Sequence, residues 1–264
     1  MATRTISEEL IVGSGATQRK IAVIRREGAG PGLFWLGGFS SDMAGTKALA
    51  LDTYAAERGL AMTRFDYSGH GISGGRFEDG TISRWLEEAL AIFALTSGPQ
   101  IVIGSSMGGW LALLLNEAHR ASAGNDHSRV GGLLLIAPAV DMTRDLMWAK
   151  MDEAARQELL SKGVWREPSE YSDEPYLITK ALIDDGDLHI FGDRLIETGC
   201  PVHIIQGVAD TDVPWKHATE LVSRLASDDV VLTLVKDGDH RLSRPEDIER
   251  MIAAIDGLMA ETSD

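Results

Sequence analysis

One short sequence has the residue types of a nucleophilic turn: Gly-Ser-Ser-Met-Gly at residues 104–108, which matches the pattern G-x-S-x-G. An apolar run, residues 101–103, precedes it, and a helix-like run, residues 110–115, follows it. A strand, a sharp turn and a helix in this order lift a serine hydroxyl above a sheet, where it can attack a carbonyl carbon. We therefore expect Ser106, rather than Ser105, to be the nucleophile. A glycine-rich turn without chemistry is the alternative interpretation.

A serine hydroxyl becomes a strong nucleophile only when a neighbouring base takes its proton, and seven histidines could supply that base. His240 lies in the loop after the last apolar run, residues 230–235, so we expect it at the end of the sheet that carries Ser106. The other histidines suit structural or surface positions, and they are His70, His119, His127, His189, His203 and His217. His70 lies in a glycine-rich turn, where a structural hydrogen bond is the expected use.

The third member of such a site is a carboxylate that orients the imidazole. The loop at residues 207–214 follows the apolar run at residues 202–205 and contains both Asp210 and Asp212. Each follows a predicted strand, and each comes between the serine and the histidine in the chain. We prefer Asp210, and we expect the other aspartate to stabilise the turn or cap the next helix.

Two backbone N–H groups are expected to hold the oxygen that becomes negatively charged during attack. One belongs to Met107, the residue after the nucleophile. The other is expected in the loop after the apolar run at residues 33–36, where Gly37 and Gly38 let the backbone approach closely. Phe39 is therefore the second predicted donor, with an ordinary tight turn as the alternative.

The elements that must position these residues alternate between short apolar runs and helical patterns. Continuous runs of four to six apolar residues suit strands buried on both faces, which is typical of a parallel sheet. The predicted strands are residues 21–24, 33–36, 61–65, 100–103, 132–136, 202–205 and 230–235. The predicted helices are residues 46–58, 82–96, 109–121, 216–226 and 245–259. This alternation predicts an α/β fold, a mostly parallel sheet flanked by helices.

One stretch, residues 141–197, interrupts this alternation; it contains helical pieces and no clear strand. An insertion between two late strands is expected to form a helical cap over the strand ends, where ligands bind in open α/β sheets. We call it the cap segment, and we expect a single domain over residues 1–264. Met147, Trp148 and Trp215 are candidate substrate contacts, although cap methionines and aromatic residues could equally serve to bury the cap against the core.

Composition narrows the classes of function. The chain has 264 residues, with 25 basic against 40 acidic residues and a net charge of -15, which disfavours binding to nucleic acids and anionic membranes. The single cysteine, Cys200, excludes a disulfide framework within the chain and a cysteine-based zinc cluster, and residues 184–187 lack the remaining ligands of a calcium loop. Glu8 and Glu9 occupy the start of the chain, and the apolar run at residues 110–115 is too short to span a bilayer, so we predict a cytoplasmic location.

Together these motifs resemble the α/β-hydrolase superfamily, and the resemblance covers nearly the whole chain. Its marks are the oxyanion loop at residues 37–39, the Asp-Tyr-Ser-Gly-His-Gly-Ile-Ser turn at 66–73, the serine turn at 104–108, the acid loop at 207–214 and Asp239-His240. In the superfamily's acid loop the first aspartate is the functional one, which supports Asp210. One departure is Gly37, which stands where the superfamily usually has histidine.

More narrowly, residues 104–110, 212–215 and 237–243 resemble the family of mitochondrial palmitoyl-protein thioesterases, whose members also cleave acyl glucuronides. The resemblance implies hydrolysis of a small-molecule carboxylic ester or thioester through an acyl-enzyme intermediate, with no cofactor and no metal. A serine peptidase is the first alternative, with Glu153, Glu158 or Glu167 to hold a free amine. A non-catalytic binding protein on the same scaffold is the second.

Overall fold

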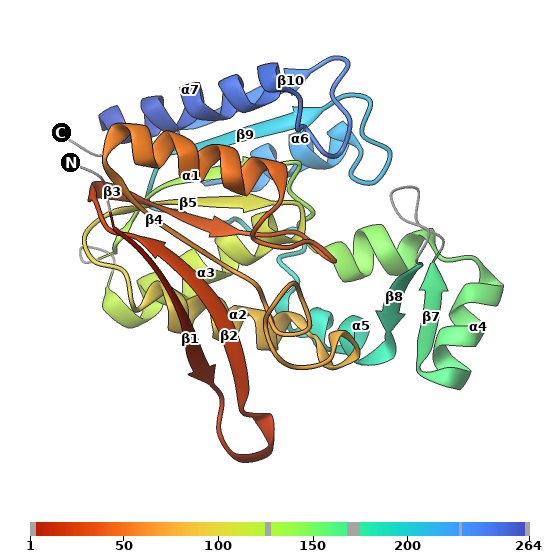
Figure 1. The fold of residues 1–264 in the computed structure, drawn as a ribbon. Helices are drawn as coiled ribbons and strands as arrows, with labels where there is room; N and C mark the ends of the chain where they lie inside the picture. The colour runs from red at the N-terminus through yellow and green to blue at the C-terminus, as the bar shows by residue number, and fades with distance from the viewer. Residues whose placement is uncertain (1–3, 125–127, 168–174, 227–228, 262–264) are drawn as a thin grey trace.

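The computed structural model describes residues 4–124, 128–167, 175–226 and 229–261. In these residues a single eight-stranded sheet runs through the molecule in the order β1-β2-β4-β3-β5-β6-β9-β10, and its pairs from β4 to β10 are parallel (Figure 1). Its strands are β1 (Thr5–Val12), β2 (Arg19–Arg26), β3 (Ala29–Leu36), β4 (Leu60–Phe65), β5 (Gln100–Ser105), β6 (Val130–Ile136), β9 (Val202–Gly207) and β10 (Val230–Val235). The predicted α/β fold with a mostly parallel sheet is confirmed.

Helices cover both faces of the sheet because the central strands are apolar on both sides. The helices are α1 (Thr46–Arg58), α2 (Ile82–Phe93), α3 (Met107–Ala123), α4 (Glu153–Lys162), α5 (Lys180–Gly186), α6 (Trp215–Arg224) and α7 (Pro245–Glu261). Helices α1 and α7 lie on one face and α2 and α3 on the other, and each face has its own apolar core (Figure 1). No helix of the described residues is long and apolar enough to cross a bilayer.

The parallel strands end at one edge of the sheet, and their following loops meet there. Strand β3 leads to the loop at residues 37–42, β5 to Ser106, β9 to Asp210 and β10 to His240. In open α/β sheets this edge is where ligands bind. The topology therefore brings four segments that are far apart in the chain to one place.

The cap segment leaves the sheet after β6 and returns at β9, beside the carboxyl ends of the strands (Figure 1). It contains α4, α5 and short helical turns, among them a π-helical turn at Thr143–Met147 and the 3₁₀ turns Trp148–Lys150 and Asp187–His189. It also contains a two-stranded antiparallel sheet, β7 (Val164–Glu167) with β8 (Tyr176–Thr179). The expectation of a cap without strands is therefore wrong, because four-residue strands are too short to show a period. The boundaries 141–197, and the single domain over 1–264, stay predictions.

Candidate active site

The serine turn has the strained geometry that its glycines permit. Ser106 lies between β5 and α3 with φ 56° and ψ -120°, a backbone conformation that non-glycine residues rarely adopt. A Cβ atom on Gly104 would lie 2.2 Å from the carbonyl oxygen of Gly108, and one on Gly108 would lie 2.1 Å from that of Leu36. Side chains are thus excluded on both sides of Ser106, and the turn holds its hydroxyl at the head of α3.

A chain of hydrogen bonds joins the three residues that the sequence singled out. The Oγ atom of Ser106 lies 3.0 Å from Nε2 of His240, and Nδ1 of His240 lies 2.9 Å from Oδ2 of Asp210. An imidazole with its proton on Nδ1 donates to the carboxylate and accepts the serine proton at Nε2. This arrangement can raise the nucleophilicity of Ser106.

Several hydrogen-bond donors hold the carboxylate of Asp210 in one orientation. Its Oδ1 accepts hydrogen bonds from the backbone N–H groups of Asp212 and Val213, at 3.0 and 2.9 Å, and its Oδ2 accepts one from the side-chain amide of Gln206 at 3.0 Å. The carboxylate is buried, and His240 completes its set of donors. Four donors fix its orientation, so Asp210 is positioned to hold the imidazole in one tautomer.

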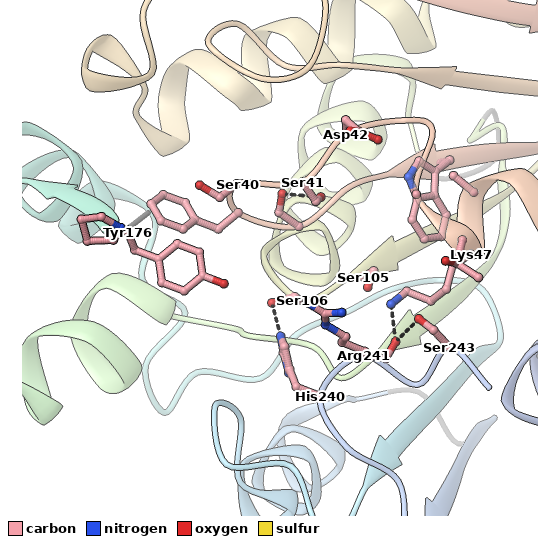
Figure 2. Close-up of a pocket in the computed structure, with 17 residues that line it drawn as sticks. Ser40, Ser41, Asp42, Lys47, Ser105, Ser106, Tyr176, His240, Arg241 and Ser243 are labelled. Carbon is pink, nitrogen blue, oxygen red and sulfur yellow. Dashed lines mark hydrogen bonds between the residues drawn. The ribbon is translucent and has the colours of Figure 1, made fainter. Parts of the chain in front are cut away.

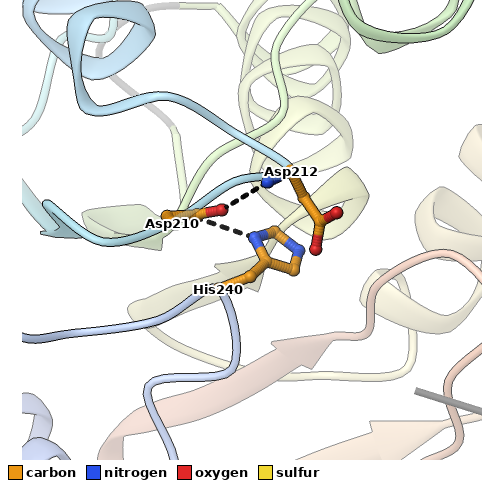
Figure 3. Close-up of side chains that lie close together, drawn as sticks. All are labelled: Asp210, Asp212 and His240. Atoms are coloured by element: carbon orange, nitrogen blue, oxygen red, sulfur yellow. Dashed lines mark hydrogen bonds and ion pairs between the residues drawn. The ribbon is translucent and has the colours of Figure 1, made fainter. Parts of the chain in front are cut away.

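The side chain of Asp212 also lies close to the imidazole of His240, which raises the question of a metal site. Ligand atoms of Asp210, Asp212 and His240 lie within 4.8 Å of one another, which is close enough for a shared metal ion (Figure 3). The oxygens of Asp210 already accept four hydrogen bonds, however, and a metal ion would have to displace them. The backbone N–H of Asp212 donates to Asp210, and this hydrogen bond would be kept whatever the side chain at position 212.

The predicted oxyanion loop is supported by His70. The ring nitrogen Nε2 of His70 accepts a hydrogen bond from the N–H of Ser40 at 3.2 Å, and Nδ1 donates to the carbonyl of Ser68 at 3.2 Å. Burial lowers the pKa of His70, which favours the neutral ring that this pairing needs. The expected structural hydrogen bond of His70 is thus present, and it supports the loop in which Gly37 stands for the usual histidine.

Phe39 and Met107, the predicted N–H donors, flank the serine. Phe39 lines the cavity beside Ser106, and Met107 is the first residue of α3, where a backbone N–H has no acceptor within its own helix. A Cβ atom on Gly38 would lie 3.3 Å from that of Ser106, so the loop passes close to the nucleophile. A carbonyl oxygen beside Ser106 would face both segments.

A cavity of about 600 Å³ opens on one side of Ser106, and both polar and apolar side chains line it (Figure 2). Its wall includes serines of the loop at residues 40–41, together with Lys47 and Arg241. The Nζ atom of Lys47 donates to the carbonyl oxygen of Arg241, and burial lowers the pKa of Lys47 to about 8. Tyr176, from β8, projects from the opposite wall with its hydroxyl directed toward Ser106 (Figure 2).

A smaller cavity of about 130 Å³ lies on the other side, under the cap segment. Its apolar wall includes Met142, Leu146 and the predicted contact Met147, and its polar wall consists of Lys150, Glu167 and Asp212. Ser106, His240, Phe39 and Tyr176 border both cavities.

Two other predicted contacts lie away from these cavities. Trp148 stacks under the guanidinium of Arg156 within the cap segment, 5.1 Å from its ring centre. Trp215 begins α6 and is 37% exposed. The structure therefore brings Met147, but neither tryptophan, to the walls of the two cavities.

The remaining described histidines have structural partners away from Ser106. His119 pairs with the N–H of Arg129, His189 with Ser83 and His203 with Thr233. His217 was expected on the surface but is buried, because its side of α6 faces the loop after β6, where it donates to the carbonyl of Val140. His127 lies outside the described residues.

Among the residues that line the two cavities, sequence reasoning did not single out Lys47, Lys150 or Tyr176. Each lies in a segment without a motif, and each reaches the cavities only because α1 and the cap segment pack beside the strand ends. Of the three glutamates considered for an amine, Glu153 and Glu158 pair with Gln157 and Lys162 on α4. Glu167 alone of these three lines a cavity at Ser106.

Comparison with known proteins shows the family to which the chain belongs. The sequence pattern of the Alpha/beta hydrolase family matches residues 28–251. The mitochondrial palmitoyl-protein thioesterase ABHD10 of Homo sapiens is 36% identical over 92% of this chain and 78% of its own length. The structure of the alpha/beta hydrolase domain-containing protein 10 from mouse superposes with a TM-score of 0.83 at 32% identity, covering 96% of this chain and 99% of the other. The predicted family resemblance, fold and hydrolase class are confirmed.

A protein of known structure from Agrobacterium vitis S4, which carries the general name hydrolase, is 50% identical with a TM-score of 0.92, covering 97% of this chain and 99% of its own. The comparisons contradict one prediction. The curated relatives from mammals are all named as mitochondrial, so the predicted cytoplasmic location is wrong. That prediction depended on the absence of an apolar leader, which does not distinguish one compartment inside the cell from another.

Proposed function

Because this chain belongs to the alpha/beta hydrolase family, we propose that it hydrolyses carboxylic esters or thioesters, with Ser106, His240 and Asp210 as a catalytic triad. The observation that carries the proposal is the position of His240, whose two ring nitrogens lie within hydrogen-bond distance of Ser106 and Asp210. The same arrangement recurs in serine hydrolases of unrelated folds, so it is recognised by its geometry.

In the first half-reaction, Oγ of Ser106 attacks the acyl carbon while Nε2 of His240 takes its proton. The electron pair of the carbonyl moves to its oxygen, which the N–H groups of Phe39 and Met107 stabilise. The bond to the leaving oxygen or sulfur then breaks, and the leaving group takes the proton from Nε2. Asp210 keeps the imidazole oriented and stabilises its positive charge.

In the second half-reaction, water replaces the leaving group. Nε2 of His240 takes a proton from the water as its oxygen attacks the acyl carbon of the acyl-enzyme. The bond to Oγ then breaks, Ser106 recovers its proton from His240, and the carboxylic acid is released. Serine, histidine and aspartate end in their starting states, so no cofactor is consumed.

The two cavities suggest where the acyl group and the leaving group of a substrate bind. The apolar wall of Met142, Leu146 and Met147 suits an acyl group. The larger cavity, whose wall includes serines, Lys47 and Arg241, suits the leaving alcohol or thiol. The name of the human relative places palmitoyl thioesters among the substrates to test.

The proposal is tested with p-nitrophenyl esters from acetyl to palmitoyl and with a palmitoyl thioester, using wild-type protein and Ser106→Ala. We expect kcat to fall on the order of 10⁶-fold in Ser106→Ala, by analogy with other serine triads. Circular dichroism of both proteins checks that the fold is kept. Retention of most of the activity by Ser106→Ala, or the absence of turnover by wild-type protein on every ester and thioester, would overturn the proposal.

A further inference from the structure

The wall of the small cavity includes a carboxylate, that of Glu167, which is unusual for a pocket that binds an acyl group. Glu167, at the end of β7, faces the space that also borders Ser106 and His240. Among the residues that the structure describes, its carboxylate accepts no hydrogen bond, and its nearest charges are those of Lys150 and Asp212. A partly buried carboxylate without donors is costly, so a partner from a ligand would be favourable.

The charge around Glu167 favours a positive partner. Lys150 is turned toward the acid loop, where its Nζ donates to the carbonyl oxygens of Thr211 and Asp212 at 3.2 and 2.7 Å. This wall thus carries one ammonium group, that of Lys150, and two carboxylates, those of Glu167 and Asp212. Burial raises the pKa of Glu167, Lys150 opposes that rise and Asp212 adds to it, so a second cation would relieve the carboxylate.

We propose that Glu167 is a specificity-determining residue that selects short acyl groups ending in an ammonium group. The inference rests on the proposed function, since it takes the small cavity as the acyl pocket. A cavity of about 130 Å³ is similar in volume to engineered cavities of about 150 Å³ that hold one benzene molecule, so about six non-hydrogen atoms fit. The acyl chain would lie along Met142, Leu146 and Met147, with its ammonium group at Glu167.

The test compares pairs of p-nitrophenyl esters of equal size, in which an ammonium group replaces the last methyl group. The pairs are 3-aminopropanoyl with butanoyl and 6-aminohexanoyl with heptanoyl. For each protein we take the ratio of kcat/KM for the amino ester to that for the plain ester. Comparing this ratio between variants cancels the different intrinsic reactivities of the two esters.

For at least one chain length, we expect the ratio to fall about tenfold or more in Glu167→Gln, because a hydrogen bond to a charged group contributes roughly 1.5–3 kcal/mol. Glu167→Lys should lower it further. Glu153→Gln, a change of an exposed glutamate on α4, is the matched control and should leave the ratio unchanged. Circular dichroism checks that each variant is folded, and only the control Glu153→Gln is expected to hydrolyse the plain esters as wild-type protein does.

An equal ratio in wild-type protein, Glu167→Gln and Glu167→Lys at both chain lengths would overturn the role of Glu167. Failure of the proposed function has a different signature. In that case wild-type protein would show no hydrolysis of the plain esters above that of Ser106→Ala. The two failures are therefore distinguished by the plain esters alone.

Discussion

Two aspartates lie beside His240, and their hydrogen bonds predict different effects of substitution. The carboxylate of Asp210 orients the imidazole and is itself held by four donors. We expect Asp210→Asn to lower kcat by about 10⁴-fold, as the equivalent change does in a well-studied serine protease, because an amide favours the wrong tautomer. Asp212→Asn keeps its backbone N–H and should cost less than about tenfold. Measured kcat values for p-nitrophenyl butanoate that rank the two variants in the reverse order would assign the acid to Asp212.

Some site residues could be predicted from the sequence alone, and others could not. Ser106 was predictable because its strand, turn and helix are contiguous, so the strain at the turn is encoded within about ten residues. Asp210 and Asp212 lie in one loop after the same strand, so their positions in the sequence do not distinguish them. The hydrogen bonds of the folded chain show which carboxylate is held against His240. Tertiary packing alone brings Glu167 and Lys47 to the cavities beside Ser106. The sequence around them therefore does not predict this position.

At the scale of elements, one carboxylate joins the start of the cap segment to its end. Asp141 follows β6, is fully buried, and accepts hydrogen bonds from the N–H groups of Phe191 and Gly192 at 2.8 and 2.9 Å. Arg224, from α6, pairs with the same carboxylate at 3.3 Å. The entrance and exit of the cap segment are therefore fastened at one point, which sets where the wall of the small cavity lies.

Asp141→Asn tests this fastening. The amide cannot match both N–H donors and leaves Arg224 without its buried partner, so we expect a loss of about 3 kcal/mol in the free energy of unfolding. Asn is chosen because Asp141 has a positive φ, which Asn tolerates. Asp145→Asn is the control, since Asp145 pairs with Arg144 at the surface. Equal urea midpoints for the two variants would contradict a structural role for Asp141.

Two elements have the bounds that the sequence predicted. Helix α1 and strand β10 begin and end at the predicted residues, because glycine bounds α1 and five of the six residues of β10 are apolar, although β10 is an edge strand with Val231 and Leu234 exposed. Strand β1 was missed because it alternates exposed with half-buried residues at the edge of the sheet and has no continuous apolar run. Strand β1 is held by backbone hydrogen bonds to β2, and the amino-acid composition of β1 does not predict this pairing.

At the scale of the whole molecule, contacts between distant segments hold the two halves of the active-site edge together. The Nζ atom of Lys47, on α1, donates to the carbonyl of Arg241, in the loop that carries His240 and 194 positions along the chain. A Cβ atom on Gly207 would lie 2.3 Å from the carbonyl of Gly238, so the acid loop and the histidine loop also touch. Local patterns predict the elements, whereas these contacts follow only from the order of strands in the sheet.

The Lys47 contact makes a prediction about stability and pH. Burial lowers the pKa of Lys47 from 10.5 to about 8 in the folded protein. Below about pH 8 the ammonium is charged in both states, and the folded state bears the cost of its partial burial. Between about pH 8 and 10.5 the unfolded chain holds more protons than the folded one, so rising pH favours folding.

We therefore expect the stability of wild-type protein, relative to Lys47→Met, to rise as the pH increases from 7.5 to 10. Urea unfolding of both proteins at several pH values measures this difference, and the comparison removes the effects of all other titrating groups that the two share. Lys216→Met, a change at an exposed lysine on α6, should show no such trend against wild-type protein. A stability difference between wild-type protein and Lys47→Met that stays constant across this range would mean that Lys47 keeps its ordinary charge in the fold, and that the contact with Arg241 carries no buried ammonium.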